Sequence, residues 1–195
     1  MHEIIRQIAT VPAPSDLVGR KVTFVGGEPL LSPTVLEDLA YTRSLGLVTS
    51  LVTNGLLLTD DLIRRLAPAL DWLTLSIDSL DNETNRIIGR ATRSGQILTP
   101  SDYLQRIKAA QRFGVRVKLN TVVNRANAGE DMTAFVREAL PLRWKLFQAT
   151  RIAGENEYDF SRWEIDEKTF RDFVARHADL STLGITIVPE TQGDN

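Results

Sequence analysis

The motif Gly26-Gly27-Glu28-Pro29 stands directly after a short apolar segment, Lys21–Val25, that predicts a strand. Two adjacent glycines at the end of a strand leave backbone groups open to a ligand, because no side chain covers them. In α/β folds, ligands bind at the carboxyl ends of parallel strands. A tight turn that needs glycine for its dihedral angles would explain the same residues. The motif by itself therefore predicts either a ligand site or a turn.

Four polar or cationic side chains occupy alternating positions in two later apolar segments. Side chains of a strand point alternately to its two faces, so residues two apart share a face. The polar positions would then face one side of a sheet, while Val117, Leu119 and Leu146 face the other. Grouped cations in a chain of net charge -2 favour a polyanionic ligand such as a nucleoside triphosphate, although an open, solvated sheet face would show the same pattern. The four residues are Lys118, Asn120, Arg143 and Lys145.

Strand-like and helix-like segments alternate along the chain. The predicted strands are Lys21–Val25, Val48–Thr53, Asp71–Ile77, Val115–Val123 and Arg143–Ala149, with residues 185–188 as a short apolar end. The predicted helices are His2–Ala9, Pro33–Leu45, one that begins at Asp60, Thr99–Phe113, Glu130–Leu140 and Asp166–His177. Ser32 would cap the second helix, and Pro33 would be its first residue. About five strand–helix units in this order predict an α/β fold with a parallel sheet, closed or partly closed as a barrel.

The composition is that of an ordinary globular domain, with 195 residues of which 43% are hydrophobic and 25% charged. We therefore expect a single domain over residues 1–195, with its core in residues 20–190. The net charge of -2 argues against binding to nucleic acid or to a membrane, and without an apolar run of membrane length or a secretory signal we expect a cytoplasmic protein. The sequence has no cysteine, which excludes disulfides, thiolate zinc sites and a cysteine-ligated iron–sulfur cluster in this chain. With two distant histidines, we expect no metal site.

A series of short motifs follows the order found in one enzyme family. The motifs are Phe24–Pro29, Thr53-Asn54-Gly55, Leu75–Ser79, Ile88-Gly89-Arg90, Lys118–Arg125, Glu130–Thr133, Arg143–Gln148 and Gly154-Glu155-Asn156. Gly-Gly-Glu-Pro marks radical S-adenosylmethionine (SAM) enzymes broadly, whereas Arg-Trp-Lys-x-Phe-Gln followed by Gly-Glu-Asn is much narrower. Over about residues 20 to 190, the chain resembles the viperin-like radical SAM enzymes, an antiviral nucleotide dehydratase family.

The resemblance implies a partial TIM barrel of the radical SAM type, with SAM and a 4Fe–4S cluster at the carboxyl ends of the strands. It implies the dehydration of a nucleoside triphosphate to its 3′-deoxy-3′,4′-didehydro product, which terminates viral RNA synthesis. The implied SAM-binding residues are Gly26, Gly27, Glu28 and Pro29 at the amino group, and Asn54, Ser76 and Arg90 at the ribose and carboxylate. The implied nucleotide-binding residues are Lys21, Lys118, Asn120, Arg143 and Lys145.

Some of these residues have simpler explanations. Asn54-Gly55 is a common turn dipeptide whatever the function. Arg90 lies in sequence among Arg86 and Arg93, which a solvated surface would also explain. The residues that only the resemblance implies as ligand contacts therefore also have a structural explanation, as part of a turn or of a solvated surface.

Structural roles are also expected for other polar residues. Glu28 and Asp78 could pair with the cations or cap a turn instead of contacting a ligand. Asp131 is expected in the first turn of a helix, and His177 late in a helix, where a favourable contact with the helix dipole is expected. The tryptophans are expected in the core or at its rim. They are Trp72, Trp144 and Trp163.

One departure from the family concerns the cluster. Radical SAM enzymes bind it through a Cys-x3-Cys-x2-Cys loop after the first strand, and this sequence has no cysteine. The resemblance therefore predicts a shortened chain that lacks the first strand and its loop, which a separate chain could supply, and that ends before the family's C-terminal tail. The open edge of Lys21–Val25 would then favour aggregation or a partner. The alternative is a degenerate protein that binds a nucleotide or a partner without redox chemistry.

Overall fold

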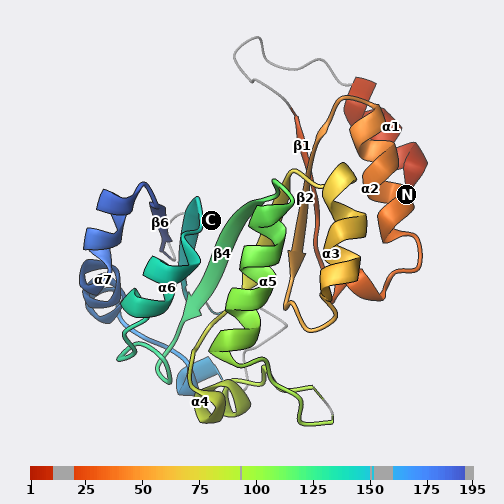
Figure 1. Ribbon diagram of the computed structural model, residues 1–195. Helices are drawn as coiled ribbons and strands as arrows, with labels where there is room; N and C mark the ends of the chain where they lie inside the picture. Colours follow the sequence, from red (N-terminus) through yellow and green to blue (C-terminus); the bar gives the residue numbers. More distant parts are fainter. Residues whose placement is uncertain (11–19, 93, 150, 152–159, 192–195) are drawn as a thin grey trace. The chain divides into compact units, whose positions relative to one another are not determined.

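The computed structural model describes residues 1–10, 20–92, 94–149, 151 and 160–191 (Figure 1). Arg93 and the Gly154-Glu155-Asn156 motif lie outside the described residues. The chain divides into two compact units, the first with residues 1–75 and 105–117 and the second with residues 76–104 and 118–195. Each unit is described by itself, and the single domain expected over residues 1–195 stays a prediction.

The first unit contains a parallel arrangement of β1 (Lys21–Phe24), β2 (Val48–Thr53) and β3 (Trp72–Ser76), whose last residue begins the second unit. Buried apolar side chains such as Leu51 and Leu73 lie side by side on β2 and β3, which explains why these strands are stable in the interior. β1 is the edge strand, as expected, and pairs only with β2 among the described strands.

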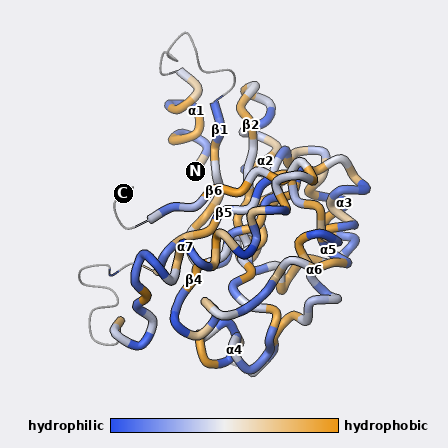
Figure 2. Tube along the Cα trace, turned by 90° about the vertical axis from the view of Figure 1, so that its left-hand side faces the viewer, coloured by the Kyte–Doolittle hydropathy of each residue, from blue (hydrophilic) through white to orange (hydrophobic). Residues whose placement is uncertain are grey.

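The helices of the first unit are α1 (His2–Thr10), α2 (Val35–Ser44), α3 (Asp60–Leu66) and the larger part of α5 (Pro100–Arg112), with 3-10 turns at Pro29–Leu31 and Ala67–Ala69. α2 packs on β2, and α1 packs on α2 (Figure 1). α1 contains three isoleucines, Ile4, Ile5 and Ile8, and its tube has orange, hydrophobic segments in Figure 2. Of these, Ile5 is buried, whereas Ile4 and Ile8 are exposed.

The helix after the glycine motif begins at Val35 with Thr34 as its N-cap, so the prediction that it begins at Pro33 with Ser32 as cap is wrong. A separate 3-10 turn takes up the preceding residues, Pro29–Leu31, and the backbone N–H of Ser32 closes that turn on the Pro29 carbonyl. Ser32 Oγ accepts a long hydrogen bond from the Thr34 N–H, at 3.4 Å. The serine thus ends one turn instead of opening the helix.

In the second unit, β4 (Arg116–Val123), β5 (Arg143–Gln148) and β6 (Thr186–Glu190) run parallel, although the first two residues of β4 belong to the first unit. The sequence predicted only a short apolar end where β6 forms, so the prediction of five strands was one too few. β6 pairs with β5 alone among the described strands and contains Pro189. A proline is tolerated on an edge strand because its missing N–H leaves no inner partner unsatisfied.

The helices of the second unit are α4 (Asn82–Ile87), the start of α5 (Pro100–Arg112), α6 (Thr133–Ala139) and α7 (Glu167–Arg176). Two 3-10 helices, Phe160–Arg162 and Ala178–Leu183, complete the described part of the unit. α7 packs on β5, and the second 3-10 helix packs on α6 and β6. Among the helices described in either unit, none is long and apolar enough to span a membrane.

α6 begins three residues later than predicted, so Asp131 precedes the helix instead of lying in its first turn. The side chains of the preceding residues make other bonds: Glu130 Oε1 accepts the Leu80 N–H, and Asp131 Oδ1 accepts the Thr133 N–H at 2.8 Å. The N-cap residue, Met132, donates its backbone N–H to His177 Nε2 at 3.0 Å. Contacts distant in sequence therefore set the start of this helix.

His177 lies fully buried at the C-terminal end of α7, where its ring contacts a carbonyl of the last turn, as expected from its place late in a helix. Burial lowers the pKa of His177, against smaller opposing effects of its bond to the Phe173 carbonyl and of the Asp131 charge. The ring packs edge-on against Trp144 with 5.0 Å between centroids, and Nδ1 bonds to the Phe173 carbonyl at 2.8 Å. Nε2 accepts a hydrogen bond, so this ring is neutral in the fold.

Stability should fall as the pH falls through the ordinary range of a histidine. Because burial lowers the pKa of His177 below its ordinary value of about 6.5, the unfolded chain takes up a proton there that the folded chain does not. We expect the free energy of unfolding to drop by about 1 kcal/mol from pH 7 to pH 5.5 through this residue. Urea unfolding at several pH values measures it, and His177→Gln, which keeps a donor and an acceptor but does not titrate, should flatten the profile. An equally steep profile in this variant would assign the loss to other groups.

Leu140, which ends α6, has a left-handed backbone with φ of 45° and is 49% exposed. A left-handed conformation costs an L-residue about 1–2 kcal/mol, whereas glycine adopts it freely but loses about 0.5–1 kcal/mol of chain entropy. We therefore expect Leu140→Gly to stabilise the protein by about 0.5–1 kcal/mol in denaturant unfolding. Leu140→Ala is the control, since it shortens the side chain but keeps the strain. Equal stability of both variants would contradict this explanation.

Candidate functional site

The two glycines of the Gly-Gly-Glu-Pro motif have backbone conformations that glycine favours. The φ angles of Gly26 and Gly27 are +103° and +51°. A Cβ atom built on either residue would meet nothing within 4 Å, so crowding is not the reason for glycine. The motif is therefore a tight turn, as one interpretation predicted, and its backbone also borders open space, which the ligand interpretation requires.

Glu28 fixes this turn to the end of the neighbouring strand. Its Oε1 accepts hydrogen bonds from the Thr53 hydroxyl at 2.7 Å and from the Leu30 N–H at 3.1 Å, and its Oε2 accepts the Asn54 N–H at 3.0 Å. A carboxylate offers about four acceptor positions, so one position on Oε2 remains for a further donor. Glu28 thus acts as a cap, as the structural alternative held, and still has room for an ammonium group.

Asn54 forms the turn that its dipeptide predicted. Its Oδ1 accepts the Leu56 N–H at 2.8 Å, and the side chain is exposed. Close to the motif, the first unit contains a cavity of about 310 Å³. Gly26, Glu28 and Pro29 line it together with residues of β1 and α2. Three of the implied SAM-binding residues thus border one cavity.

The other implied SAM-binding residues belong to the second unit. Ser76 is half-buried at the end of β3. Arg90 forms an ion pair with the buried carboxylate of Asp78, whereas Arg86 makes an exposed pair with Glu83 at 3.3 Å. Arg86 is therefore the solvated surface residue, and Arg90 is held by a buried partner. Asp78 pairs with a cation, which is one of the roles expected from the sequence.

The alternating pattern of the later strands is confirmed. Along β4 and β5, buried residues alternate with half-buried ones. Lys118 is in register with Arg143, and Asn120 with Lys145, so these four side chains form one polar face of the second unit. Lys21, the fifth implied nucleotide-binding residue, lies in the first unit, where it begins β1 and is exposed.

Two atoms of this polar face lack partners. Asn120 Oδ1 and Arg143 Nε are buried and accept or donate no hydrogen bond within the described residues. Buried polar groups are nearly always hydrogen-bonded, so an acceptor and a donor left without partners on one face indicate a place for a polar ligand. Their types suit a ligand with both hydroxyl or amine donors and anionic acceptors.

Glu190 is a member of this face that the sequence analysis missed. Its Oε1 pairs with Lys145 Nζ, and both side chains are mostly buried, at 28% and 23% exposed. Lys145 Nζ also lies 5.2 Å from the centroid of the Phe147 ring. Thr186, Val188 and Glu190 are two residues apart, so they would share one face of a strand. This spacing becomes informative only once residues 186–190 are taken as a strand.

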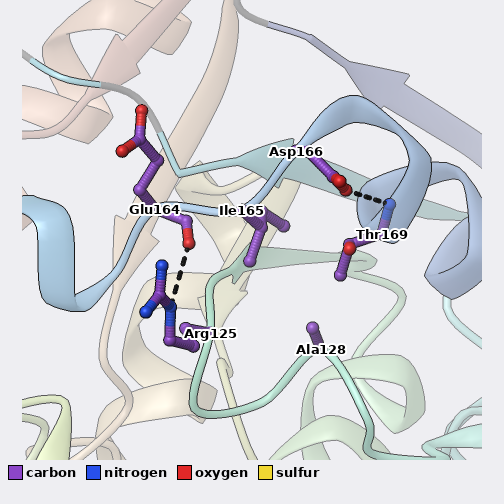
Figure 3. Close-up of a pocket in the computed structure, with 6 residues that line it drawn as sticks. All are labelled: Arg125, Ala128, Glu164, Ile165, Asp166 and Thr169. Atoms are coloured by element: carbon purple, nitrogen blue, oxygen red, sulfur yellow. Dashed lines mark hydrogen bonds between the residues drawn. The ribbon is translucent and has the colours of Figure 1, made fainter.

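A second cavity of the second unit, of about 470 Å³, lies beside the start of α7 (Figure 3). Arg125 Nε donates to the Glu164 carbonyl at 3.3 Å, and Asp166 caps α7 by accepting the Thr169 N–H at 2.7 Å. Because the bonds that define it serve to anchor a loop and a helix, it is a weaker candidate than the polar face. The lining residues are Arg125, Ala128, Glu164, Ile165, Asp166 and Thr169.

A family model described as the Radical SAM superfamily matches residues 2–139 of the chain. The chain belongs to this superfamily. The superfamily uses SAM with a 4Fe–4S cluster. In this chain, the Gly-Gly-Glu-Pro motif forms the tight turn beside the cavity described above.

Relatives with curated names extend the comparison. The chain is 41% identical, over 90% of its length, to an S-adenosylmethionine-dependent nucleotide dehydratase of Flammeovirga pacifica and covers 58% of that protein. It is 35% identical, over 98% of its length, to an S-adenosylmethionine-dependent nucleotide dehydratase of Lacinutrix mariniflava, and covers 38% of that protein. It is 34% identical, over 88% of its length, to the S-adenosylmethionine-dependent nucleotide dehydratase RSAD2 of Siniperca chuatsi, and covers 49% of that protein. The chain thus spans about half the length of these relatives.

Solved structures confirm the predicted fold class. The crystal structure of SuiB from Streptococcus suis superposes with a TM-score of 0.73 at 18% identity, over 98% of this chain and 42% of SuiB. Native anSMEcpe with bound AdoMet superposes with a TM-score of 0.66 at 17% identity, over 97% of this chain and 53% of that one. The radical SAM type of α/β fold is therefore shown.

The two cofactors of the family differ in how well they fit these residues. The open acceptor position on Glu28 and the cavity beside it suit the amino group of SAM. The cluster does not fit, because the sequence has no cysteine and the described residues contain no group of three or more His, Cys, Asp or Glu that could hold a metal ion. Thiolate ligands for a cluster would have to come from outside these 195 residues.

Proposed function

We propose that this chain is the nucleotide-binding and SAM-binding part of a viperin-like nucleotide dehydratase that acts in antiviral defence. Its substrate would be a nucleoside triphosphate and its product the 3′-deoxy-3′,4′-didehydro form. The names of the relatives support the reaction. The observation that carries the proposal is the polar face of β4 and β5, where Asn120 Oδ1 and Arg143 Nε lie buried without partners beside two lysines.

On this proposal the polar face binds the nucleotide. Arg143 and Lys145 would neutralise phosphate oxygens, with Arg143 Nε donating to one of them, because guanidinium and ammonium groups bind phosphate by charge-assisted hydrogen bonds. Lys118 would add a third cation. Asn120 Oδ1 would accept a hydrogen bond from a hydroxyl or amine of the nucleoside. Lys21 of the first unit is proposed as a further contact from the resemblance alone.

SAM would be held by the residues that the resemblance implies. The Glu28 carboxylate would accept a hydrogen bond from the SAM amino group, with Gly26, Gly27 and Pro29 exposing backbone to it. Asn54, Ser76 and Arg90 would contact its ribose and carboxylate. When bound and given one electron by a cluster, SAM would supply radical chemistry for the abstraction of a hydrogen atom. No residue of this chain is assigned to that step.

The ligands of the cluster would come from another segment or another chain. The edge of β1 is unpaired among the described strands, which supports a partner strand at this position. We expect the chain alone to be prone to aggregation for the same reason. Cytoplasmic location and the absence of nucleic-acid and membrane partners stay predictions from composition.

Isothermal titration of the purified chain with nucleoside triphosphates and with SAM tests the proposal. We expect triphosphate binding that weakens as salt is raised, since phosphate contacts are ionic. Nucleoside without phosphate should bind much more weakly. Binding of triphosphate without any binding of SAM would favour the degenerate, non-redox binding protein, and the lack of binding to either would contradict both.

A further inference from the structure

Asp78 is a buried carboxylate whose two oxygens are both engaged. It follows β3 and is 6% exposed. Oδ1 accepts the Val122 N–H of β4 at 2.8 Å, and Oδ2 accepts from the Arg90 guanidinium. A buried charge is costly unless it is paired and hydrogen-bonded, so this site depends on Arg90. The contacts leave Asp78 poorly placed to bind a ligand directly.

Arg90 has donors left after it binds Asp78. Its Nε and one terminal nitrogen engage Asp78 Oδ2, and no other acceptor bonds to the guanidinium within the described part of the chain. The side chain is 35% exposed. A guanidinium has five N–H donors in a rigid plane, so the Asp78 contact sets the direction of the donors that remain.

The backbone around Asp78 is also held in place. Asn127 Nδ2 donates to the Asp78 carbonyl at 2.7 Å and to the Val122 carbonyl at 2.9 Å. The preceding residue, Ile77, bonds to β4 through its N–H, which reaches the Asn120 carbonyl at 2.9 Å. Asp78 is therefore fixed to the strand that carries the polar face.

We infer that Asp78 is a positioning residue, which orients the free donors of Arg90 toward the carboxylate of SAM. The inference rests on the proposed function, because that proposal makes Arg90 a SAM contact. In Asp78→Asn, the amide oxygen keeps the hydrogen bond from the Val122 N–H, and the amide NH2 then takes the place of Oδ2 and faces Arg90. Two donors then face each other, so Arg90 loses its anchor while the packing volume stays the same.

The test compares two ligands by isothermal titration. SAM carries the carboxylate, whereas 5′-deoxy-5′-methylthioadenosine keeps the adenine and ribose and lacks the amino-acid group. We expect Asp78→Asn to weaken SAM binding about tenfold, as for loss of one oriented ionic contact, and to leave methylthioadenosine binding unchanged. Arg90→Gln should have the same effect, and the double variant should be no weaker than either single one. Asp172→Asn, which breaks an exposed pair with Lys168 on α7, is the matched control and should change neither.

Each outcome of these titrations supports or overturns the positioning role of Asp78. Equal weakening of both ligands by Asp78→Asn would indicate a purely structural role and overturn the inference. Unchanged SAM binding in that variant, or additive effects of the two substitutions, would also overturn it. If the unmodified chain binds methylthioadenosine and triphosphate but not SAM, the proposed function fails at the SAM carboxylate, and the role of Asp78 fails with it. A failure of the inference alone leaves SAM binding to the unmodified chain intact, which separates the two.

Discussion

Lys145→Ala is expected to weaken the binding of a nucleoside triphosphate by about 10- to 100-fold. Lys145 lies on the polar face of the second unit, in register with Asn120 and mostly buried. A charge-assisted hydrogen bond to phosphate is worth about 1.5–3 kcal/mol, and each 1.4 kcal/mol is about tenfold in affinity. Isothermal titration with the triphosphate measures the loss. Lys168→Ala, which removes an exposed lysine of α7, is the matched control.

Substitution of Glu190, the ion-pair partner of Lys145, is expected to have the opposite effect on triphosphate affinity. Glu190 pairs with the ammonium that the phosphate would use, so it competes with the ligand and repels its charge. We expect Glu190→Gln to raise triphosphate affinity by about fivefold, which corresponds to roughly 1 kcal/mol for a partly exposed pair. Both effects should shrink at high salt. If Lys145→Ala weakened binding no more than Lys168→Ala, the polar face would not be the phosphate site.

Much of the polar face could be predicted because a strand repeats every two residues. The spacing of Lys118, Asn120, Arg143 and Lys145 alone puts each pair on one face of its strand, and the register of β4 and β5 brings the pairs together. Strand pairing follows from the order of elements in an α/β chain. The prediction therefore rested on local periodicity together with one general rule of topology.

The errors have a different origin. Glu190 was missed because the segment 186–190 is short, has polar residues at both ends and contains a proline, so only pairing with β5 makes it a strand. The late start of α6 depends on Leu80 and His177, which are 50 and 45 residues from their partners in the sequence. The neutral state of His177 depends on burial against Trp144. No local sequence pattern predicts these distant contacts.

The last prediction concerns Glu28, where the turn and the ligand interpretations meet. Its carboxylate binds three donors, one from the 3-10 turn Pro29–Leu31 and two from the end of β2. In Glu28→Gln, the amide NH2 would face the Asn54 N–H, so a charge-assisted bond would be replaced by a contact between two donors. Hydrogen bonds to charged groups contribute about 1.5–3 kcal/mol, so we expect a loss of about 2 kcal/mol in the free energy of unfolding.

The same substitution should weaken SAM binding about tenfold, because the ammonium group would lose its anionic acceptor. Glu37→Gln, at an exposed position in the first turn of α2, is the matched control and should alter neither quantity by more than about 0.5 kcal/mol. Urea unfolding and titration with SAM give the two values separately. A stability loss without any loss of SAM affinity would leave Glu28 as the cap of a turn, and the motif would then mark the family without binding the cofactor through this carboxylate. Loss of affinity with unchanged stability would instead show that the three backbone and hydroxyl donors are satisfied without the charge.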